Sequence, residues 1–145
     1  MVGAAIQVAE RMQRTLILVG PTDSVRTAWG LLREHRIRHL PVVDREKLVG
    51  IITDRDVRLV FPSALTSGAR DQDPHDALEK VAVQDIMTKQ VITVTPETSI
   101  ADAARLILER RIGGLPVVRA NRLVGIITKT DILAAYVEIV AETSQ

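Results

Sequence analysis

The sequence contains no cysteine and very few Phe, Trp or Tyr residues. The absence of cysteine from its 145 residues excludes disulfides, thiolate metal ligands and cysteine nucleophiles. Trp29, Phe61 and Tyr136 are the only residues of those three aromatic types, so the core must be built from aliphatic side chains. A ring-shaped ligand would therefore lie between aliphatic side chains. The scarcity also argues against binding of single-stranded nucleic acid by base stacking.

The chain also lacks a strong net charge and a long apolar run. Its 19 Lys and Arg residues nearly balance its 18 Asp and Glu residues, so no overall field would attract nucleic acid or an anionic membrane. Its apolar runs are far shorter than the ~20 residues of a membrane span. The first residues lack the basic segment and long apolar stretch of a secretory signal. These absences predict a cytoplasmic protein that neither spans a membrane nor binds nucleic acid.

The most informative feature that is present is an internal repeat. Residues 8–56 align with residues 83–131 without a gap. In this alignment Leu-Pro-Val-Val at 40–43 meets Leu-Pro-Val-Val at 115–118, and Leu-Val-Gly-Ile-Ile-Thr at 48–53 meets the same letters at 123–128. The repeat indicates two copies of one folding unit around a pseudo-twofold axis, with a cleft between the copies as the first place to look for function.

Each copy is predicted to contain a helical lead-in, a short strand, a long helix, a β-hairpin and a second helix. Hydrophobic periodicity, β-branched runs and turn residues give these expectations. In the first copy the elements are a strand at 16–19, a helix capped by Ser24, strands at 40–43 and 47–53, and a helix from 54. In the second copy they are a strand at 91–94, a helix at 99–111, strands at 115–118 and 122–128, and a helix at 129–140.

The fold class is therefore α/β (α+β), with two βαββα units. The first domain is expected at 8–60 and the second at 81–140. The linker at 61–80 contains Pro, Gly and Ser and is expected to form a short helix at 76–81.

A Thr-x-x-Asp motif ends a strand and opens a helix in both copies. It comprises Thr53 and Asp56 in the first copy and Thr128 and Asp131 in the second. One interpretation is a capping box that satisfies the free amides of the helix. The other is a ligand site, because a helix N-terminus attracts phosphate and an Asp accepts hydrogen bonds from a ribose diol. The preceding glycines, Gly50 and Gly125, would then let a ligand approach the strand.

Together these motifs resemble a pair of cystathionine-β-synthase (CBS) domains, the arrangement called a Bateman module. The resemblance covers roughly residues 8–140 and rests on the two Leu-Pro-Val-Val strands, the two Thr-x-x-Asp motifs and Ile86-Met87-Thr88. Residues 34–41 and 53–58 are similar to the stand-alone acetoin-utilisation type. The resemblance implies binding of AMP, ADP, ATP or S-adenosylmethionine between the copies, no catalytic cofactor, and a homodimer.

The resemblance also implies which residues bind the nucleotide. The Asp positions would hold the ribose and the Thr positions would lie near the phosphates. The residues around Leu-Pro-Val and those that begin the first strand of each copy would line adenine and phosphate. The implied positions in the first copy are Thr15, Leu16, Ile17, Arg38, His39, Leu40, Pro41, Gly50, Thr53, Arg55 and Asp56. Those in the second copy are Gln90, Val91, Ile92, Gly114, Leu115, Pro116, Gly125, Thr128, Lys129 and Asp131.

The two copies differ most in the cations near these positions. Arg38 and His39 align with Gly113 and Gly114, and Arg55 aligns with Thr130. A guanidinium group binds phosphate through a planar fork of donors. The first copy is therefore expected to be the stronger phosphate site. Lys129 of the second copy could reach either cleft if the sites share residues across the twofold axis.

The leading hypothesis is a regulatory module that senses an adenosine nucleotide and acts on a partner protein in trans. The alternative is a structural or docking dimer whose ligand clefts are vestigial. Nucleic-acid binding through the basic residues 33–39 is disfavoured by the balanced charge. An enzyme is not expected, because the sequence shows no acid–base pair, nucleophile motif or metal-ligand set.

Overall fold

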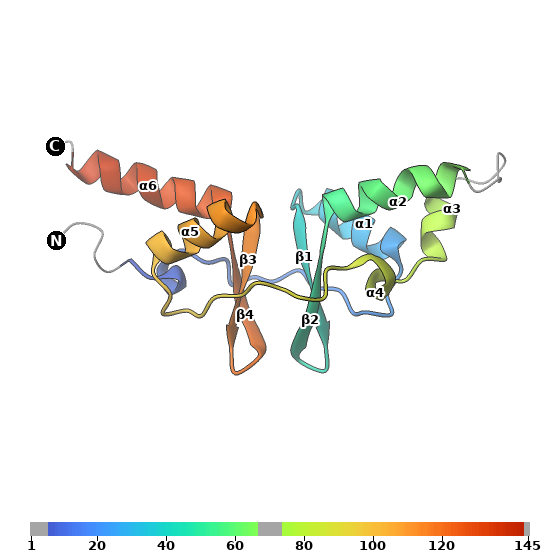
Figure 1. The fold of residues 1–145 in the computed structure, drawn as a ribbon, viewed down its shortest axis with the longest axis horizontal. Helices are drawn as coiled ribbons and strands as arrows, with labels where there is room; N and C mark the ends of the chain where they lie inside the picture. The colour runs from blue at the N-terminus through green and yellow to red at the C-terminus, as the bar shows by residue number, and fades with distance from the viewer. Residues whose placement is uncertain (1–5, 67–73, 144–145) are drawn as a thin grey trace. The chain divides into compact units, whose positions relative to one another are not determined.

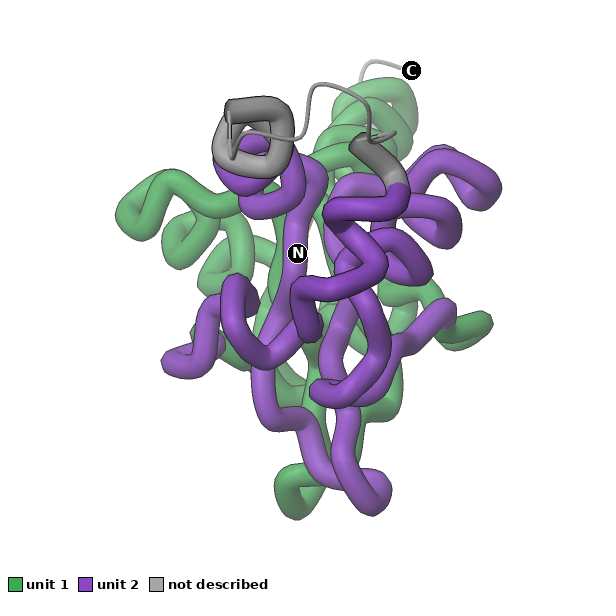
Figure 2. Tube along the Cα trace, turned by 90° about the vertical axis from the view of Figure 1, so that its right-hand side faces the viewer, with its two compact units in different colours: residues 1–16, 92–145 green, residues 17–91 purple. Residues whose placement is uncertain are grey.

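The computed structural model describes residues 6–66 and 74–143 of the chain. It divides the chain into two compact units, coloured separately in Figure 2. Unit 2 is the continuous stretch 17–91, whereas unit 1 combines residues 1–16 with residues 92–145. We call residues 8–14 the first lead-in and residues 83–89 the second lead-in. Each lead-in therefore belongs to the unit that holds the hairpin and helices of the other copy.

Unit 2 contains a β-hairpin, two helices that flank it in sequence, and two shorter helices. In chain order they are α1 (Val25–Glu34), β1 (His39–Asp44), β2 (Lys47–Thr53), α2 (Asp54–Thr66), α3 (Pro74–Glu79) and α4 (Val83–Ile86), labelled in Figure 1. Its core is aliphatic, as the composition predicts. Leu40, Ile52 and Leu78 are fully buried within it.

Unit 1 repeats the helix, hairpin and helix. Its elements are η1 (Val8–Glu10), α5 (Ile100–Arg110), β3 (Gly114–Arg119), β4 (Arg122–Thr128) and α6 (Lys129–Thr143). Val8 and Met12 of the first lead-in are buried in its core beside Leu115 and Ile127. The mixture of helices and antiparallel strands confirms the predicted α+β fold class.

The long helix before each hairpin begins at the serine that the sequence predicts. The Ser24 hydroxyl accepts the backbone amide of Thr27 at 3.0 Å, and the Ser99 hydroxyl accepts that of Asp102 at 3.0 Å. Each bond satisfies one of the amides that have no partner inside the helix. Val25, Ala28 and Leu32 then follow helical spacing and bury one face of α1 in the core.

Both hairpins have a two-residue turn with positive φ angles at both central residues. The turn residues are Arg45 and Glu46 in the first hairpin and Ala120 and Asn121 in the second. This backbone matches the right-handed twist of paired strands, as in a type I′ turn. Each hairpin also carries an irregularity in register at the same place, after Val42 and after Val117.

The strands predicted at 16–19 and 91–94 are wrong. Each segment contributes only one residue to a bridge, where Val19 pairs with Val42 and Val94 pairs with Val117. The amide of Val19 donates to the carbonyl of Pro41 at 3.2 Å, and that of Val94 to Pro116 at 3.1 Å. A longer ladder cannot form because the paired strands carry proline, which has no N–H to donate. The two segments are extended but contribute no strand.

Each lead-in forms an antiparallel bridge of one residue with the second strand of a hairpin. Gln13 and Ile126 exchange backbone hydrogen bonds of 2.8 and 3.0 Å in unit 1, and Thr88 and Ile51 exchange bonds of 3.0 and 2.9 Å in unit 2. The same backbone arrangement therefore forms twice, with a glutamine at one place and a threonine at the other.

Part of the predicted linker at 61–80 is regular structure. Helix α2 continues to Thr66, and α3 begins at Pro74, two residues before the predicted start. Proline at the first helical position needs no partner for an amide, and its φ angle suits the helix. Residues 67–73 lie outside the described part of the chain. The domain limits at 8–60 and 81–140 stay a prediction.

Candidate functional site

The amino end of α2 contains the first Thr-x-x-Asp motif. The amide of Thr53 donates to Asp56 Oδ2 at 2.9 Å, and the amide of Asp56 donates to Thr53 Oγ1 at 3.2 Å. These reciprocal bonds form a capping box, so the structural interpretation of the motif is realised. Asp56 is half-buried, and its Oδ1 accepts no hydrogen bond from any residue in the described part of the chain. One carboxylate oxygen remains available to a ligand.

The amino end of α6 repeats this capping box with a different surrounding. The amide of Thr128 donates to Asp131 Oδ2 at 2.9 Å, and the Thr128 hydroxyl donates to the same oxygen at 3.0 Å. The side-chain amide of Gln13 donates to Asp131 Oδ1 at 3.2 Å and to Oδ2 at 3.1 Å. Both oxygens of this carboxylate are therefore occupied by groups of unit 1.

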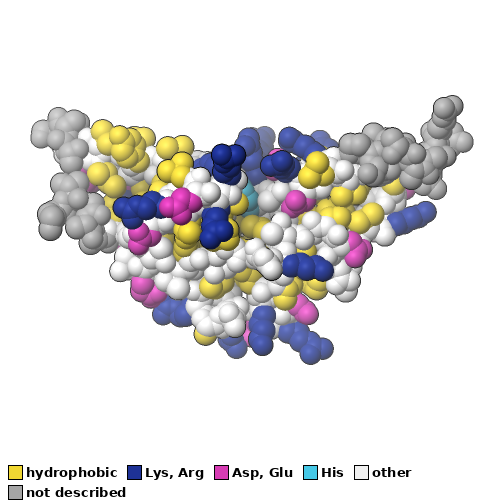
Figure 3. All heavy atoms as spheres, in the orientation of Figure 1, with side chains coloured by type: hydrophobic (Ala, Val, Ile, Leu, Met, Phe, Trp, Pro, Cys, Tyr) yellow, Lys and Arg dark blue, Asp and Glu magenta, His cyan; other side chains and the backbone are white. Residues whose placement is uncertain are grey.

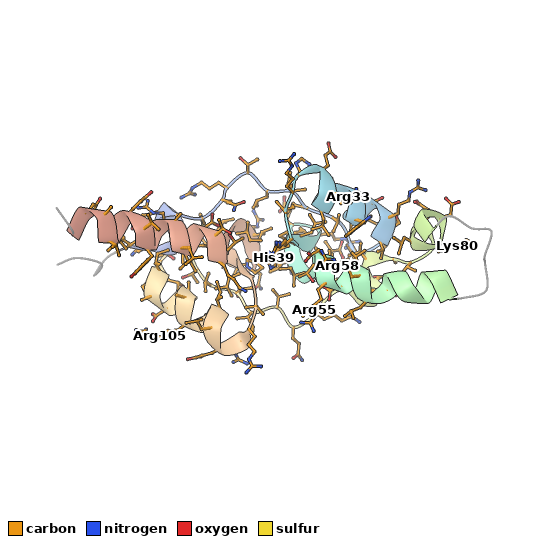
Figure 4. All side chains as sticks on the ribbon, turned by 90° about the horizontal axis from the view of Figure 1, so that it is seen from above. Arg33, His39, Arg55, Arg58, Lys80 and Arg105 are labelled. Carbon is orange, nitrogen blue, oxygen red and sulfur yellow. The ribbon has the colours of Figure 1, made fainter. Side chains whose placement is uncertain are left out.

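The cations predicted for the first copy gather around the amino end of α2. His39 is paired directly with Thr53 in the hairpin register, so the two side chains leave the same face about 4.5–5.5 Å apart. The carbonyl of Arg38 accepts the first amide of α2 at 3.2 Å, which fixes Arg38 beside the helix. Figure 4 shows His39 and Arg55 near the point where α2 begins. Arg38 and Arg55 are exposed, and His39 is half-buried.

The matching end of α6 carries fewer cations. Gly114 is paired with Thr128 and is buried, so no side chain stands opposite the threonine. The carbonyl of Gly113 accepts the amide of Lys129 at 3.0 Å. The exposed Lys129 is the single cation among the predicted binding residues of the second copy. The two helix ends therefore differ in their cations, and the predicted difference in phosphate binding stays a prediction.

Gly50 and Gly125 lie where the two lead-ins pack against the strands. The thioether of Met87 fills the place beside Gly50 where a side chain would begin, and that of Met12 does so beside Gly125. A lead-in carbonyl, of Thr88 or of Gln13, also lies 3.0 Å from each of those places. The glycines therefore admit the lead-ins to the strand, and their role in binding a ligand stays a prediction.

The residues of the two Leu-Pro pairs are structural in this geometry. Their side chains are buried, and Leu40 and Leu115 belong to the cores of units 2 and 1. They hold the hairpins in place. They present no side-chain donor or acceptor to a ligand. The four residues are Leu40, Pro41, Leu115 and Pro116.

The predicted binding residues 15–17 and 90–92 lie where the chain passes from one unit to the other. One boundary falls between Leu16 and Ile17 and the other between Val91 and Ile92. Ile17 packs against the core of unit 2, and Ile92 packs against the core of unit 1. Thr15 and Gln90 are exposed. A role for these residues in binding stays a prediction.

Two features of these units escape sequence reasoning. Gln13 was not predicted as a site residue, because the repeat gives no reason to join the first lead-in to the second copy. The other feature is the contact of Arg33 with Trp29, in which the guanidinium lies 5.8 Å from the centre of the ring while Trp29 packs against the unit 2 core. This cation–π contact is within the ~6 Å range of such pairs and accounts for one residue of the basic run 33–39.

The described residues contain neither a metal-binding cluster nor a membrane-spanning helix. No group of three or more His, Asp or Glu residues in ranges 6–66 and 74–143 is arranged to hold a metal ion. Among the helices in the same ranges, none has the length and apolar character needed to cross a bilayer.

Comparison with known proteins gives two matches to one family model. The model described as CBS domain matches residues 6–63 and residues 83–138. Among curated proteins, an inosine-5'-monophosphate dehydrogenase of Korarchaeum cryptofilum is 39% identical over 120 residues, which cover 82% of this chain and 22% of the dehydrogenase. A CBS domain-containing protein of Dictyostelium discoideum is 32% identical over 139 residues, covering 92% of this chain and 93% of that protein.

Solved structures share the fold over nearly the whole chain. A putative acetoin utilization protein (AcuB) from Vibrio cholerae superposes with a TM-score of 0.79 at 28% identity, covering 97% of this chain and 96% of that one. CBSX2 in complex with AMP gives 0.77 at 33% identity, covering 92% and 98%. The CBS domain pair of protein MJ0100, in complex with 5'-methylthioadenosine and S-adenosyl-L-methionine, gives 0.76 at 30% identity, again covering 92% and 98%.

Proposed function

Because this chain belongs to the CBS-domain family and its two CBS domains form a Bateman module, we propose that it is a regulatory module that binds an adenosine nucleotide. We further propose that it acts on a separate partner protein. The chemistry of the ligand follows from two helix ends that each combine a Thr, an Asp and a positive helix terminus. AMP, ADP and ATP share the ribose and phosphate groups that these residues suit.

One observation carries the proposal most directly. Asp56 keeps an unpartnered Oδ1 at a half-buried position while its other oxygen closes the capping box. A ribose diol offers two donors and needs such an acceptor. Arg38, His39 and Arg55 surround the same helix end and supply charge for a phosphate. We propose that Thr53 and the helix amides bind phosphate there, with Thr128 and Lys129 in the equivalent role in unit 1.

The ligands of related structures support an adenosine compound. One neighbour is in complex with AMP, and another is in complex with 5'-methylthioadenosine and S-adenosyl-L-methionine. All three ligands contain adenosine, and they differ in what is attached to its 5' carbon. The cations around α2 favour a phosphate at that position over a sulfonium group. We therefore expect AMP, ADP or ATP to bind more tightly than S-adenosylmethionine.

Thermal unfolding with added ligand tests the proposal. A ligand at about 100 times its Kd adds about 2.7 kcal/mol to the free energy of unfolding, which raises the melting temperature by several degrees. AMP, ADP, ATP and S-adenosylmethionine are added separately, with GMP as the matched nucleotide lacking adenine. The double variant Asp56→Ala, Asp131→Ala is the protein control. A wild-type protein that is stabilised by none of the four adenosine ligands would refute the proposed function.

We propose a role without catalysis. The chain spans only about a fifth of the dehydrogenase it resembles, because the match covers 22% of that enzyme. The enzyme's activity is therefore not carried over to this chain. The proposed output is a change in an interaction with a partner protein, and a cytoplasmic location stays a prediction.

An exposed apolar stripe on α6 supports a homodimer. Leu133, Tyr136 and Val137 are 64%, 62% and 63% exposed, and Val140 is 42% exposed. Their spacing places them on one face of the helix. Figure 3 shows hydrophobic side chains gathered over α6. Continuous apolar surface of this kind is typical of protein interfaces.

Sedimentation of matched variants tests the dimer. We expect Val137→Asp to shift the protein toward monomer at micromolar concentration, because a charge in an apolar interface is desolvated without a partner. Leu108→Asp is the control, since Leu108 is 77% exposed and belongs to α5 and not to the α6 stripe. A monomeric wild-type protein contradicts the dimer but leaves nucleotide binding intact. A dimer that binds no adenosine ligand would instead favour a docking module with vestigial ligand sites.

A further inference from the structure

The first lead-in brings a donor to the carboxylate that is proposed to bind ribose in unit 1. Gln13 Nε2 lies 3.2 Å from Asp131 Oδ1 and 3.1 Å from Oδ2. A carboxylate only accepts hydrogen bonds, so the NH₂ group of the amide must face it. Oδ2 already accepts the amide and the hydroxyl of Thr128. The two donors of a ribose diol therefore meet an acceptor that is already engaged.

The backbone of Gln13 is firmly positioned next to this carboxylate. Its amide and carbonyl exchange bonds of 2.8 and 3.0 Å with Ile126. The preceding Met12 is only 8% exposed and fills the space beside Gly125. The following Arg14 donates to the carbonyl of Ala9 at 3.0 Å. Because the backbone on both sides of Gln13 is held in place, its side chain remains within reach of Asp131 and competes with a ligand at a high effective concentration.

The equivalent residue in unit 2 is Thr88. It makes the same backbone bonds, of 3.0 and 2.9 Å, with Ile51. Its side chain is shorter than that of glutamine, and no hydrogen bond joins it to Asp56 in the described part of the chain. Asp56 therefore keeps an open oxygen at the place where Asp131 has none. The two helix ends differ in the residue contributed by the lead-in as well as in their cations.

We propose that Gln13 is an internal competitor for the Asp131 carboxylate and that it weakens adenosine binding in unit 1. This inference rests on the proposed function, since it assumes that ribose binds at these aspartates. A bound ribose must displace the Gln13 amide, and the lost hydrogen bond is subtracted from the affinity. Adenosine ligands then occupy the Asp56 site first and the Asp131 site only at higher concentration. The identity of the residue at this lead-in position, Gln13 or Thr88, thereby sets the order in which the two sites bind the ligand.

Calorimetric titration with adenosine isolates the effect, because adenosine carries no phosphate and does not depend on the cations. The Asp56→Ala background leaves only the Asp131 site. Adding Gln13→Ala to it is expected to tighten adenosine binding about three- to tenfold, which corresponds to the net contribution of one typical hydrogen bond. The reciprocal change uses the repeat. In the Asp131→Ala background, Thr88→Gln is expected to weaken binding at Asp56 by a similar factor.

Three outcomes separate this inference from the proposed function. Tighter binding with Gln13→Ala together with weaker binding with Thr88→Gln supports it. Unchanged or weaker binding with Gln13→Ala overturns it, since Gln13 would then be a bystander or a ligand contact, while wild-type binding still supports the proposed function. A wild-type protein that binds no adenosine overturns both. Melting temperatures without ligand verify that each variant is folded at the temperature of titration.

Discussion

The amino ends of α2 and α6 share one backbone design and differ in what surrounds the carboxylate. Both begin with a capping box in which the Asp closes onto the Thr three residues earlier. Asp56 has one carboxylate oxygen without a partner among the described residues, and Arg38, His39 and Arg55 lie nearby. Asp131 instead accepts hydrogen bonds from Gln13, and two glycines and Lys129 lie nearby. The comparison shows that the capping box is the common part. The two helix ends differ because the residues that enter each hairpin differ and because the lead-ins contribute Gln13 in one unit and Thr88 in the other.

The largest expected effect comes from removing each carboxylate in turn. Asp56→Ala should cost roughly 1.5–3 kcal/mol of adenosine affinity at the tighter site, because a charged acceptor is lost. Asp131→Ala should leave that site unchanged. Each variant should also lose about 1 kcal/mol of stability, because each loses a helix cap. Calorimetry and thermal unfolding measure the two effects. Equal losses of stability with no change in affinity would reduce both motifs to capping.

The next effect tests the cations around α2. Arg38→Ala should weaken ADP binding about tenfold to a hundredfold, since one charge-assisted contact is worth roughly 1.5–3 kcal/mol. Adenosine binding should change little, because adenosine has no phosphate. Arg105→Ala in unit 1 is the control, as Arg105 is exposed and pairs with Asp102 one turn away. Equal losses for ADP and adenosine would mean that Arg38 supports the fold instead of the phosphate.

The third effect tests whether the two lead-ins are held in the same way. Gly125→Ala and Gly50→Ala should each lower the free energy of unfolding by about 1–3 kcal/mol, because the new methyl group collides with a methionine and a lead-in carbonyl. Gly30→Ala in α1 is the matched control. Apart from its chain neighbours and the nearby backbone of α1, no atom of the described residues lies within 4 Å of its new methyl group, so it should stabilise the helix by about 0.5–1 kcal/mol. Denaturant unfolding distinguishes the signs, and a neutral Gly125→Ala would contradict the packing.

The smallest effect concerns a feature in which the two units should not differ. Ser24→Ala and Ser99→Ala each remove a cap with a bond of 3.0 Å to an amide of the first turn. Each should cost about 1 kcal/mol of stability. Ligand affinity should not change, since neither serine lies in a Thr-x-x-Asp motif. A clear difference between the two losses would show that the helices before the hairpins are not equivalent.

The local elements were predictable because the signals for them are local. The second strand of each hairpin has the predicted bounds, and Ser24 and Ser99 cap the predicted helices. Two-residue turns and β-branched runs depend on neighbours in the chain, and the repeat gives each signal twice. The expected asymmetry between Arg38-His39 and Gly113-Gly114 is also local. The turn sets the pairing of Asp44 with Lys47, but the irregularity after Val42 shifts the register by one residue and so places His39 opposite Thr53.

The remaining features depend on contacts between distant parts of the chain. The Gln13–Asp131 contact joins residues 118 positions apart. Periodicity cannot reveal which copy a lead-in joins, so the packing of Met87 beside Gly50 and of Met12 beside Gly125 was not predictable. The strands at 16–19 and 91–94 were overpredicted for a similar reason. Their apolar residues suit a strand, but only one residue of each finds a bonding partner.

The exchange of lead-ins also has a consequence for biosynthesis. Unit 2 is continuous in sequence, so all its parts leave the ribosome before unit 1 can be completed. The first lead-in is made earliest, yet Val8 and Met12 find their core only after residues 92–127 have been synthesised. Unit 2 can therefore fold before the first lead-in has a core to pack into. Deletion of the first sixteen residues would leave unit 2 intact and open the core of unit 1.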